Sequence, residues 1–358
     1  MTKRILSAAL ALALSLSIPA FAQEESPFTD VPAGHWAYEA IAQAEREGII
    51  VGVGDGMFAP GKPLTAAQFA TIVAQAFYWQ PLREAERNLN DGEQDPDAPW
   101  YALYRKTVEQ AGLMEGTGVE DWGAPMTRYQ MAQMLYNITV DKGVETPTAG
   151  NIAIADLGQV PEQYKEAVKS AYSLNLLSGI DEKGTFAGNK PLARAQAAVV
   201  FAKLDQALEA KDGPMERALD KAERNARQYS FLSTTFTRYP GPEGTAYVCY
   251  QGGLPHGGST SMAYVYQDGR KLDINSLLPI GYRLSGTGGY LNPTEIQFSK
   301  DGDELTFVTP IEEGIPNQSP GPDNPSMWAE TKDWGPTRCT VDLLAGTMKS
   351  MEPLTPRT

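Results

Sequence analysis

The feature that most constrains the fold of this sequence is an internal repeat with a period of about 64 residues. An aromatic residue recurs at Trp36, Trp100 and Tyr164, each 64 residues after the one before. The same landmarks follow each aromatic residue: a glycine or asparagine, a turn glycine, a second aromatic residue and a polar helix start. Such self-similarity at a fixed period is typical of repeated supersecondary units.

Each unit is predicted to fold as a helix, a glycine-rich loop and a second helix. In the first unit, Ala37, Ala40, Ile41 and Ala44 have the spacing of one apolar helix face, and Gly48 follows as a left-handed C-cap would. The second helix has the same kind of face. One helical hairpin cannot bury its own apolar face, so the three units are expected to share a core.

The pattern changes near Tyr229, which predicts a different second half. A charged helical stretch over 205–227, broken at 213–214, is expected to face solvent. Beyond it, short alternating runs are separated by the turn glycines Gly269, Gly302 and Gly346, which indicates antiparallel hairpins. The predicted fold class is α+β and multidomain, with an all-α N-terminal half and a small antiparallel β domain.

The N-terminal 22 residues have the three parts of a secretory signal peptide. Lys3 and Arg4 precede an apolar run over 5–18, and Ala22 ends an Ala-x-Ala site. Cleavage after Ala22 is expected, and the alternative is an uncleaved membrane anchor. No second apolar segment of membrane-spanning length follows, so no membrane span is expected after cleavage.

Charge and composition exclude several classes of partner and site. Thirty basic and 44 acidic residues give a formal net charge of −14, so no basic surface is available for nucleic acid. Two histidines and two cysteines cannot build a zinc site of the usual spacing. For His35 we expect a structural hydrogen bond. No catalytic residue, metal or cofactor is predicted, and Cys249 and Cys339 could form a disulfide or remain two buried thiols.

The starts of the second helices carry polar side chains with two alternative roles. Thr65 and Thr127, each with a glutamine three residues later, fit the capping box, and Gln196 has the same place after Ala193. Thr65, Thr127, Gln130 and Gln196 are therefore helix-cap or ligand candidates.

Arg128 and Arg194 are harder to explain as caps. A cation in the first helical turn faces the positive end of the helix dipole, which disfavours it. An anion held by free backbone N–H groups and the guanidinium would explain both arginines, and the alternative is a pair of ordinary surface arginines. Unit 1 has Ala66 at this position, so at most two such sites are expected.

Several segments of the first unit resemble the S-layer homology motif: Phe-Thr-Asp-Val at 28–31, His-Trp-Ala at 35–37, Gly-Asp-Gly at 54–56 and Phe-Ala-Pro at 58–60. The other two units resemble it more weakly, and the resemblance covers about residues 26–205. It implies a pseudo-threefold helical domain that binds secondary cell-wall polysaccharide, often through pyruvylated sugars. By the same resemblance, Asp30 and Trp36 line a groove between repeats. The alternatives are a helix-capping role for Asp30 and core or loop packing for Trp36.

These observations predict a domain order and a function. The order is a signal peptide (1–22), three S-layer-homology-like repeats called units 1, 2 and 3 (23–80, 81–145 and 146–210), a helical connector (211–228) and a β domain of unknown function (229–358). We expect a secreted, non-enzymatic protein that the repeats anchor noncovalently to cell-wall polysaccharide at the cell surface. The alternative is a cell-envelope enzyme, a glycan or peptide hydrolase, whose C-terminal domain the repeats localise.

Overall fold

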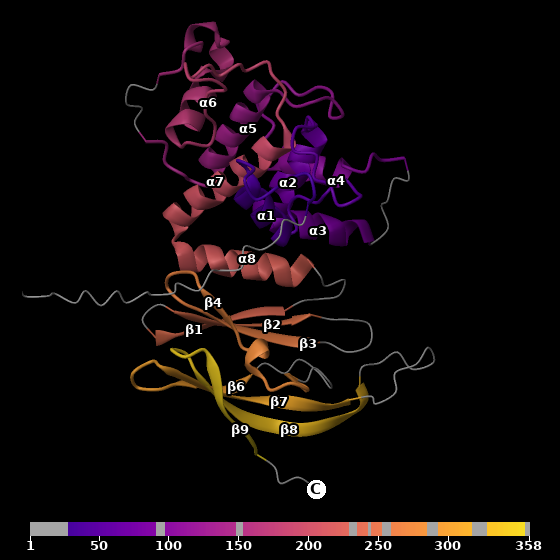
Figure 1. Ribbon diagram of the computed structural model, residues 1–358, viewed down its shortest axis with the longest axis vertical. Helices are drawn as coiled ribbons and strands as arrows, with labels where there is room; N and C mark the ends of the chain where they lie inside the picture. The colour runs from indigo at the N-terminus through magenta and orange to yellow at the C-terminus, as the bar shows by residue number, and fades with distance from the viewer. Residues whose placement is uncertain are drawn as a thin grey trace, which may run out of the picture.

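The computed structural model describes residues 28–90, 97–147, 153–228, 235–242, 245–252, 259–284, 293–316 and 328–354. A helical half and two antiparallel sheets follow one another along the long axis of the molecule, so the protein is mixed α+β as predicted (Figure 1). The predicted signal peptide lies outside the described residues.

The helical half repeats a pair of helices three times. The pairs are α1 (Tyr38–Arg46) with α2 (Ala66–Phe77), α4 (Ala102–Gln110) with α5 (Arg128–Asp141), and α6 (Glu162–Ser173) with α7 (Arg194–Asp212). The first helix of each pair is followed by a residue in the left-handed region, Gly48, Gly112 or Asn175, with φ of 65°, 71° and 54°. The sequence did not predict α3 (Trp79–Asn90), which a single residue, Tyr78, separates from the end of α2.

A closed ring of backbone hydrogen bonds joins the three units just before their second helices. Leu64 N donates to Leu192 O at 2.8 Å, Leu192 N donates to Met126 O at 3.0 Å, and Met126 N donates to Leu64 O at 2.9 Å. All three side chains are buried, and one hydrophobic cluster extends through all three units. The expectation of a shared core is therefore correct.

Helix α8 (Pro214–Gln228) lies across the base of this bundle, between it and the sheets (Figure 1). The expectation that its charges face solvent is wrong for Arg217 and Arg224, which are buried. Arg217 Nε donates to the buried Asp205 at 2.7 Å, and Arg224 Nη2 donates to Glu47 at 2.8 Å. The bundle presents acidic partners to α8, so these charges can be buried in pairs.

The β half contains two antiparallel sheets. The first has the order β1-β2-β3-β4, and the second has the order β5-β7-β8-β9 with β6 also paired to β7. Gly269, Gly302 and Gly346 have φ of 81°, 76° and 63°, as tight turns require. The strands are β1 (Thr235–Pro240), β2 (Ala246–Gly252), β3 (Ser259–Val265), β4 (Lys271–Asp273), β5 (Tyr282–Leu284), β6 (Thr294–Phe298), β7 (Glu304–Pro316), β8 (Trp328–Asp342) and β9 (Thr347–Pro353).

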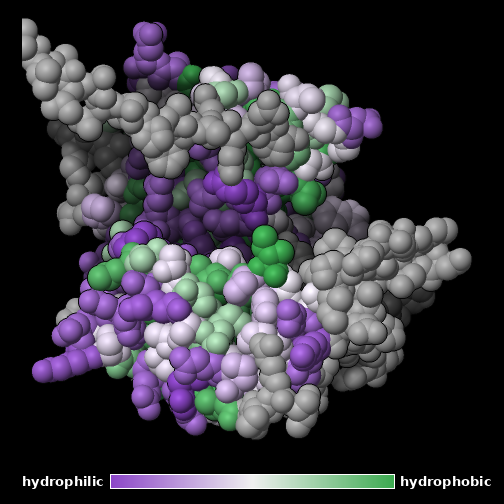
Figure 2. Space-filling model, turned by 60° about the horizontal axis from the view of Figure 1, so that its bottom comes forward, coloured by the Kyte–Doolittle hydropathy of each residue, from purple (hydrophilic) through white to green (hydrophobic). Residues whose placement is uncertain are grey.

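The alternation of side chains along β3 explains how the layers pack. Met262 and Tyr264 join the core of the second sheet, whereas Val265 packs with Leu219 of α8. The first sheet is therefore covered on one face by α8 and on the other by the second sheet (Figure 1). Figure 2, which brings the β half forward, shows hydrophobic patches on its described surface that hydrophilic residues separate.

Cys339 is a buried, free thiol on β8. Burial raises its pKa to about 12. The side chain of Cys249, on β2, lies outside the described residues, and the free state of Cys339 agrees with the alternative of two thiols rather than with a disulfide.

Candidate functional site

The second helix of each unit begins against the loop of another unit. The first two backbone N–H groups of α2, α5 and α7 all donate to carbonyl oxygens of those loops at 2.9 to 3.2 Å. The premise that these N–H groups are free to hold an anion is therefore wrong. The pairs are Ala66 to Ala124, Ala67 to Trp122, Arg128 to Lys190, Tyr129 to Gly188, Arg194 to Lys62 and Ala195 to Pro60.

Arg194, at the start of α7 in unit 3, is bound to the loop of unit 1. The residue is 7% exposed. Nε donates to Phe58 O at 2.8 Å, Nη2 donates to Val51 O at 2.6 Å, and Cζ lies 4.7 Å from the centre of the Phe58 ring. Burial lowers the pKa of Arg194, and the charge of Asp30 partly offsets this.

Arg128, at the start of α5 in unit 2, makes the same contacts with the loop of unit 3. It is 3% exposed, and its guanidinium donates to Phe186 O at 2.7 Å and to Ser178 O at 2.6 Å. The sequence predicts either an anion-binding arginine or a surface arginine, whereas the structure shows a buried side chain that holds a loop. The structure does not test contact of Arg128 or Arg194 with a ligand, and their burial favours a role in positioning the loops.

Two aspartates hold the same loops from the other side. Asp30 accepts hydrogen bonds from Phe58 N and Ala59 N, both at 2.8 Å. Asp156 accepts from Phe186 N at 2.7 Å and Ala187 N at 2.9 Å. The printed bonds of the Asp30 carboxylate therefore order a loop, and none of them reaches the start of α1, whose N-cap residue is Ala37. Sequence reasoning missed this role for Asp156, although its place in unit 3 matches that of Asp30 in unit 1.

We call each set of one aspartate, one loop and one arginine from another unit a loop clamp. Each loop clamp encloses an alanine in the left-handed region, Ala59 with φ of 57° or Ala187 with φ of 53°. A residue with a Cβ atom pays about 1 to 2 kcal/mol for this conformation. The hydrogen bonds from both sides keep the backbone in it.

The loop of unit 2 has a different arrangement. Ala66, at the start of α2, faces this loop and provides no guanidinium. Arg105, which belongs to unit 2 itself, places its Cζ 5.2 Å from the centre of the Trp122 ring. Tyr101 of unit 2 stacks on the same ring, with the ring centres 6.0 Å apart. The alanine at position 66 therefore affects the loop of unit 2, and not that of unit 1.

Two of the three repeated aromatic residues are exposed to solvent. Trp36 is 65% exposed and Trp100 is 64% exposed, whereas Tyr164 is buried and stacks on Tyr129 with a ring distance of 5.1 Å. Core packing is therefore excluded for Trp36, whereas Trp100 contacts the rings of Tyr101 and Tyr104 at 5.5 and 6.5 Å while most of it stays exposed. His35 makes a structural hydrogen bond, because its Nδ1 accepts from Ala37 N at 3.2 Å.

The remaining candidate side chains order the helix starts. Thr65 accepts from Gln68 N at 3.2 Å, and Thr127 accepts from Gln130 N at 3.3 Å. Gln130 and Gln196 accept from the backbone N–H three residues earlier at 2.9 and 3.0 Å. Ala193 has no hydroxyl, so unit 3 forms only half of a capping box. A ligand role for these four residues stays a prediction.

Among the residues that the structure describes, no helix is both long and apolar enough to cross a membrane. The same residues contain no group of three or more His, Cys, Asp or Glu side chains that could hold a metal ion.

Comparison with known proteins gives a family-model match within the helical half and several relatives of this chain. The S-layer homology domain model matches residues 27–70 and 153–198, which contain the aspartate and the left-handed alanine of each loop clamp. An S-layer protein of Bacillus thuringiensis subsp. finitimus is 37% identical over 91 residues, 25% of this chain and 11% of the relative. S-layer protein EA1 of Bacillus anthracis is 27% identical over 198 residues, 54% of this chain and 22% of the relative.

A third relative has a name of a different kind. An uncharacterized cell wall amidase of Bacillus anthracis is 28% identical over 191 residues, which is 51% of this chain and 32% of the relative. The chain therefore spans a third or less of the length of each of these relatives.

Proposed function

The chain contains S-layer homology domains, which mark secreted proteins of the cell wall and cell surface, and from this premise we propose that its helical half binds cell-wall polysaccharide. Binding of this kind anchors the protein noncovalently. The ring of hydrogen bonds among Leu64, Met126 and Leu192 supports a pseudo-threefold arrangement of the three units. Pyruvylated sugars are the form of ligand that the resemblance implies.

The observation that carries the proposal is the pair of exposed indoles at Trp36 and Trp100. They occupy the same position in two units, and each leaves most of a large aromatic side chain in water. Aromatic faces pack against the apolar faces of sugar rings, and the indole N–H can donate to a hydroxyl. Tryptophan also contributes strongly to binding energy where it becomes buried in an interface.

In this proposal the loop clamps position the binding surface and do not contact the sugar. Asp30 and Arg194 fix the loop of unit 1, and Thr29 N donates to Gly56 O of that loop at 2.9 Å. The segment that leads to Trp36 is thereby tied to the clamped loop. Asp30, Arg128 and Arg194 are therefore proposed as positioning residues.

We propose that the β half faces away from the cell wall when the repeats are bound to it. Helix α8 separates the repeat junctions from the first sheet, and Arg238 of β1 pairs with Glu216 of α8 at 2.8 Å. This arrangement places the β domain at the opposite end of the molecule from α6 (Figure 1).

A second candidate is an envelope enzyme that the repeats localise, and the relative named as a cell wall amidase favours it. Incubating the full secreted chain with purified wall distinguishes the two functions. Release of soluble peptide or glycan supports the enzyme, and stable binding without release supports anchoring.

The tryptophans provide the direct test of the proposal. We expect the Trp36→Ala, Trp100→Ala double variant to bind purified wall at least about tenfold more weakly than the wild type. Ile280→Ala, which removes a fully exposed apolar side chain of the β half, is the control and should bind normally. Wall from which the non-peptidoglycan polymer has been removed should bind neither the wild type nor the Ile280→Ala control. Unchanged binding by the double variant would contradict the proposed site.

A further inference from the structure

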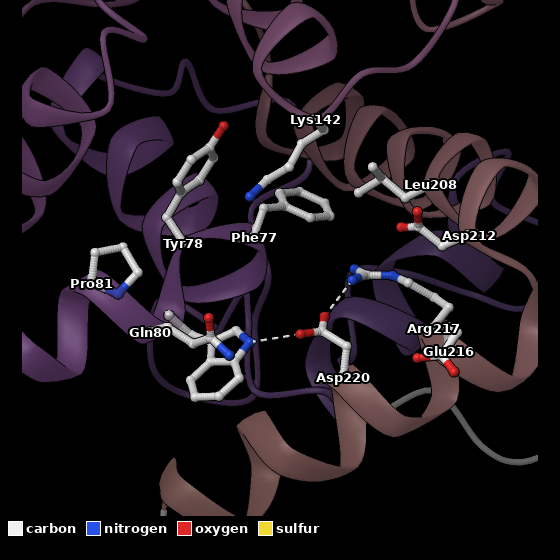
Figure 3. A pocket seen from close by; sticks show the side chains of 11 residues that line it. Phe77, Tyr78, Gln80, Pro81, Lys142, Leu208, Asp212, Glu216, Arg217 and Asp220 are labelled. Carbon is white, nitrogen blue, oxygen red and sulfur yellow. Dashed lines mark hydrogen bonds and ion pairs between the residues drawn. The ribbon is translucent and has the colours of Figure 1, made fainter.

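A cavity of about 470 Å³ lies at the base of the helical bundle, away from the repeat junctions (Figure 3). This volume is within the range of about 300 to 1,000 Å³ that small-molecule sites occupy. The end of α2 and the start of α3 form one wall, α7 and α8 form another, and Lys142 after α5 closes the third side. The walls combine aromatic and aliphatic surface with polar side chains: Phe77, Tyr78, Trp79, Gln80, Pro81, Leu208, Asp212, Glu216, Arg217 and Asp220.

Most charged groups around this cavity have a close partner of opposite charge. Arg217 is bonded to Asp205 at 2.7 Å and to Asp220 at 2.5 Å, and Asp220 also accepts from Trp79 Nε1 at 3.1 Å. Asp212 pairs with Lys211 at 2.6 Å. Glu216 pairs with Arg238 at 2.8 Å. These groups form a fixed polar wall.

Lys142 differs from them. Its nearest carboxylate oxygen among the described residues is Asp141 Oδ2 at 3.8 Å, which is too far for a hydrogen bond. That carboxylate already accepts from Tyr78 Oη at 2.6 Å. The ammonium lies 4.0 Å from the centre of the Tyr78 ring, and Figure 3 shows it directed toward Tyr78. No acceptor in the described part of the chain takes a hydrogen bond from this ammonium, so its three N–H donors are available to a ligand.

We propose that this cavity binds one acidic sugar unit, with its carboxylate on the Lys142 ammonium and its ring against the aromatic wall. A carboxylate satisfies the available donors of Lys142. The walls at Tyr78, Trp79 and Pro81 suit the apolar face of a sugar ring, and Gln80 and Asp212 can bind its hydroxyl groups. The site is separate from Trp36 and Trp100, so it is additional to the proposed wall-binding surface.

The charge state of Lys142 responds to such a ligand. Burial lowers its pKa, Asp141 and Asp220 raise it, and Arg217 and Lys211 lower it further. A carboxylate bound to the ammonium favours the charged form and so raises the pKa. A neutral sugar in the same cavity lacks this effect.

Calorimetric titration of the full secreted chain tests the proposal with glucuronate, glucose and acetate as probes. Glucuronate should bind at least about tenfold more tightly than glucose or acetate, because only glucuronate offers both the ring and the carboxylate. Lys142→Met should weaken glucuronate binding by about tenfold or more, and Lys142→Arg should retain most of it. Lys106→Met, at an exposed position on α4, is the matched control and should bind as the wild type does.

Two results would overturn the proposal: no binding of glucuronate to the wild type, or equal binding to wild type and Lys142→Met. If Lys142→Met does not fold, nuclear magnetic resonance titration of the wild-type Lys142 signal decides the question. Glucuronate should raise its pKa and glucose should not, and an unchanged pKa would contradict the site. The Trp36→Ala, Trp100→Ala variant should keep glucuronate binding, which separates this site from the wall-binding surface.

Discussion

The loops of units 1 and 3 differ from the loop of unit 2 in how their backbone is held. In units 1 and 3, a carboxylate and a buried guanidinium from another unit enclose an alanine with positive φ. The loop of unit 2 has a cation near the Trp122 ring, and this cation comes from its own unit. The comparison shows that the arginine at the start of a second helix holds the loop of a different unit. Unit 1 lacks this arginine, but the loop that lacks a loop clamp is that of unit 2.

Arg194→Ala is expected to have the largest effect on this comparison. The change removes two charge-assisted hydrogen bonds and leaves Phe58 O and Val51 O without them inside the junction. We expect a loss of about 3 kcal/mol in the free energy of unfolding, measured by urea denaturation followed by helical circular dichroism. Arg194→Lys keeps the charge but not the planar fork, so its loss should be smaller. A loss no larger than that of Arg105→Ala would contradict the loop clamp.

Asp30→Asn tests the other side of the same loop clamp. Desolvation raises the pKa of Asp30, but the hydrogen bonds from the N–H groups of Phe58 and Ala59 outweigh it, so the pKa lies below the ordinary value. The asparagine side chain has one acceptor oxygen and no charge, so it can replace only one of the two hydrogen bonds that the carboxylate accepts. We expect a loss of about 1 kcal/mol in the free energy of unfolding at neutral pH. Asp121→Asn is the matched comparison and should lose less, because among the described residues its carboxylate accepts a hydrogen bond from Gly123 N alone, at 2.8 Å in unit 2.

The pH dependence of the Asp30→Asn difference follows from the direction of the shift. A lowered folded-state pKa gives stability above the unfolded-state pKa, and this stability is lost as the pH falls through the folded-state value. The gap between wild type and Asp30→Asn should therefore be constant near neutral pH and shrink below about pH 4. A gap that widened in acid would show that the carboxylate of Asp30 is not stabilised in its charged form.

Ala59→Gly and Ala187→Gly should each stabilise the protein slightly. Glycine adopts positive φ without the Cβ clash, although it also loses more backbone entropy on folding. The expected net gain is about 0.5 to 1 kcal/mol, measured by thermal denaturation. Ala124→Gly in the loop of unit 2 is the control, because Ala124 is not among the described residues with positive φ, and it should destabilise. A loss at position 59 would indicate that the loop is not strained there.

Arg105→Ala is the smallest expected effect. An exposed cation over an aromatic ring contributes about 0.5 to 1 kcal/mol, and Arg105 also pairs with Glu109 on the surface. Denaturation of the variant should show a loss within that range. A loss as large as that of Arg194→Ala would mean that unit 2 depends on Arg105 as heavily as unit 1 depends on Arg194.

The sequence was sufficient to predict the repeated helices and the hairpins, because both depend on local signals. The apolar spacing of α1 and the turn residues Gly302 and Gly346 are visible within a few positions. The loop clamps were not predictable in this way. Arg194 reaches backbone carbonyls 136 and 143 residues away, and a carbonyl oxygen has no sequence signature.

Helix α8 shows the same limit for charged residues. Its sequence is typical of a solvated helix, yet Arg217 and Arg224 are buried because Asp205 and Glu47 lie opposite them. The partners come from α7 and from the end of α1, so only the assembled bundle reveals them. The cavity beside Lys142 is assembled from four helices in the same way, and no single segment indicated it.

Sedimentation of two fragments with purified wall tests the central claim most directly. The helical fragment should extend over residues 23–228, because α8 pairs its buried arginines with the bundle, and the β fragment covers 229–358. Folding of each fragment is checked first by circular dichroism. We predict that the helical fragment sediments with wall that retains its polysaccharide and that the β fragment stays in solution. A β fragment that sediments while the folded helical fragment stays in solution would contradict anchoring by the repeats.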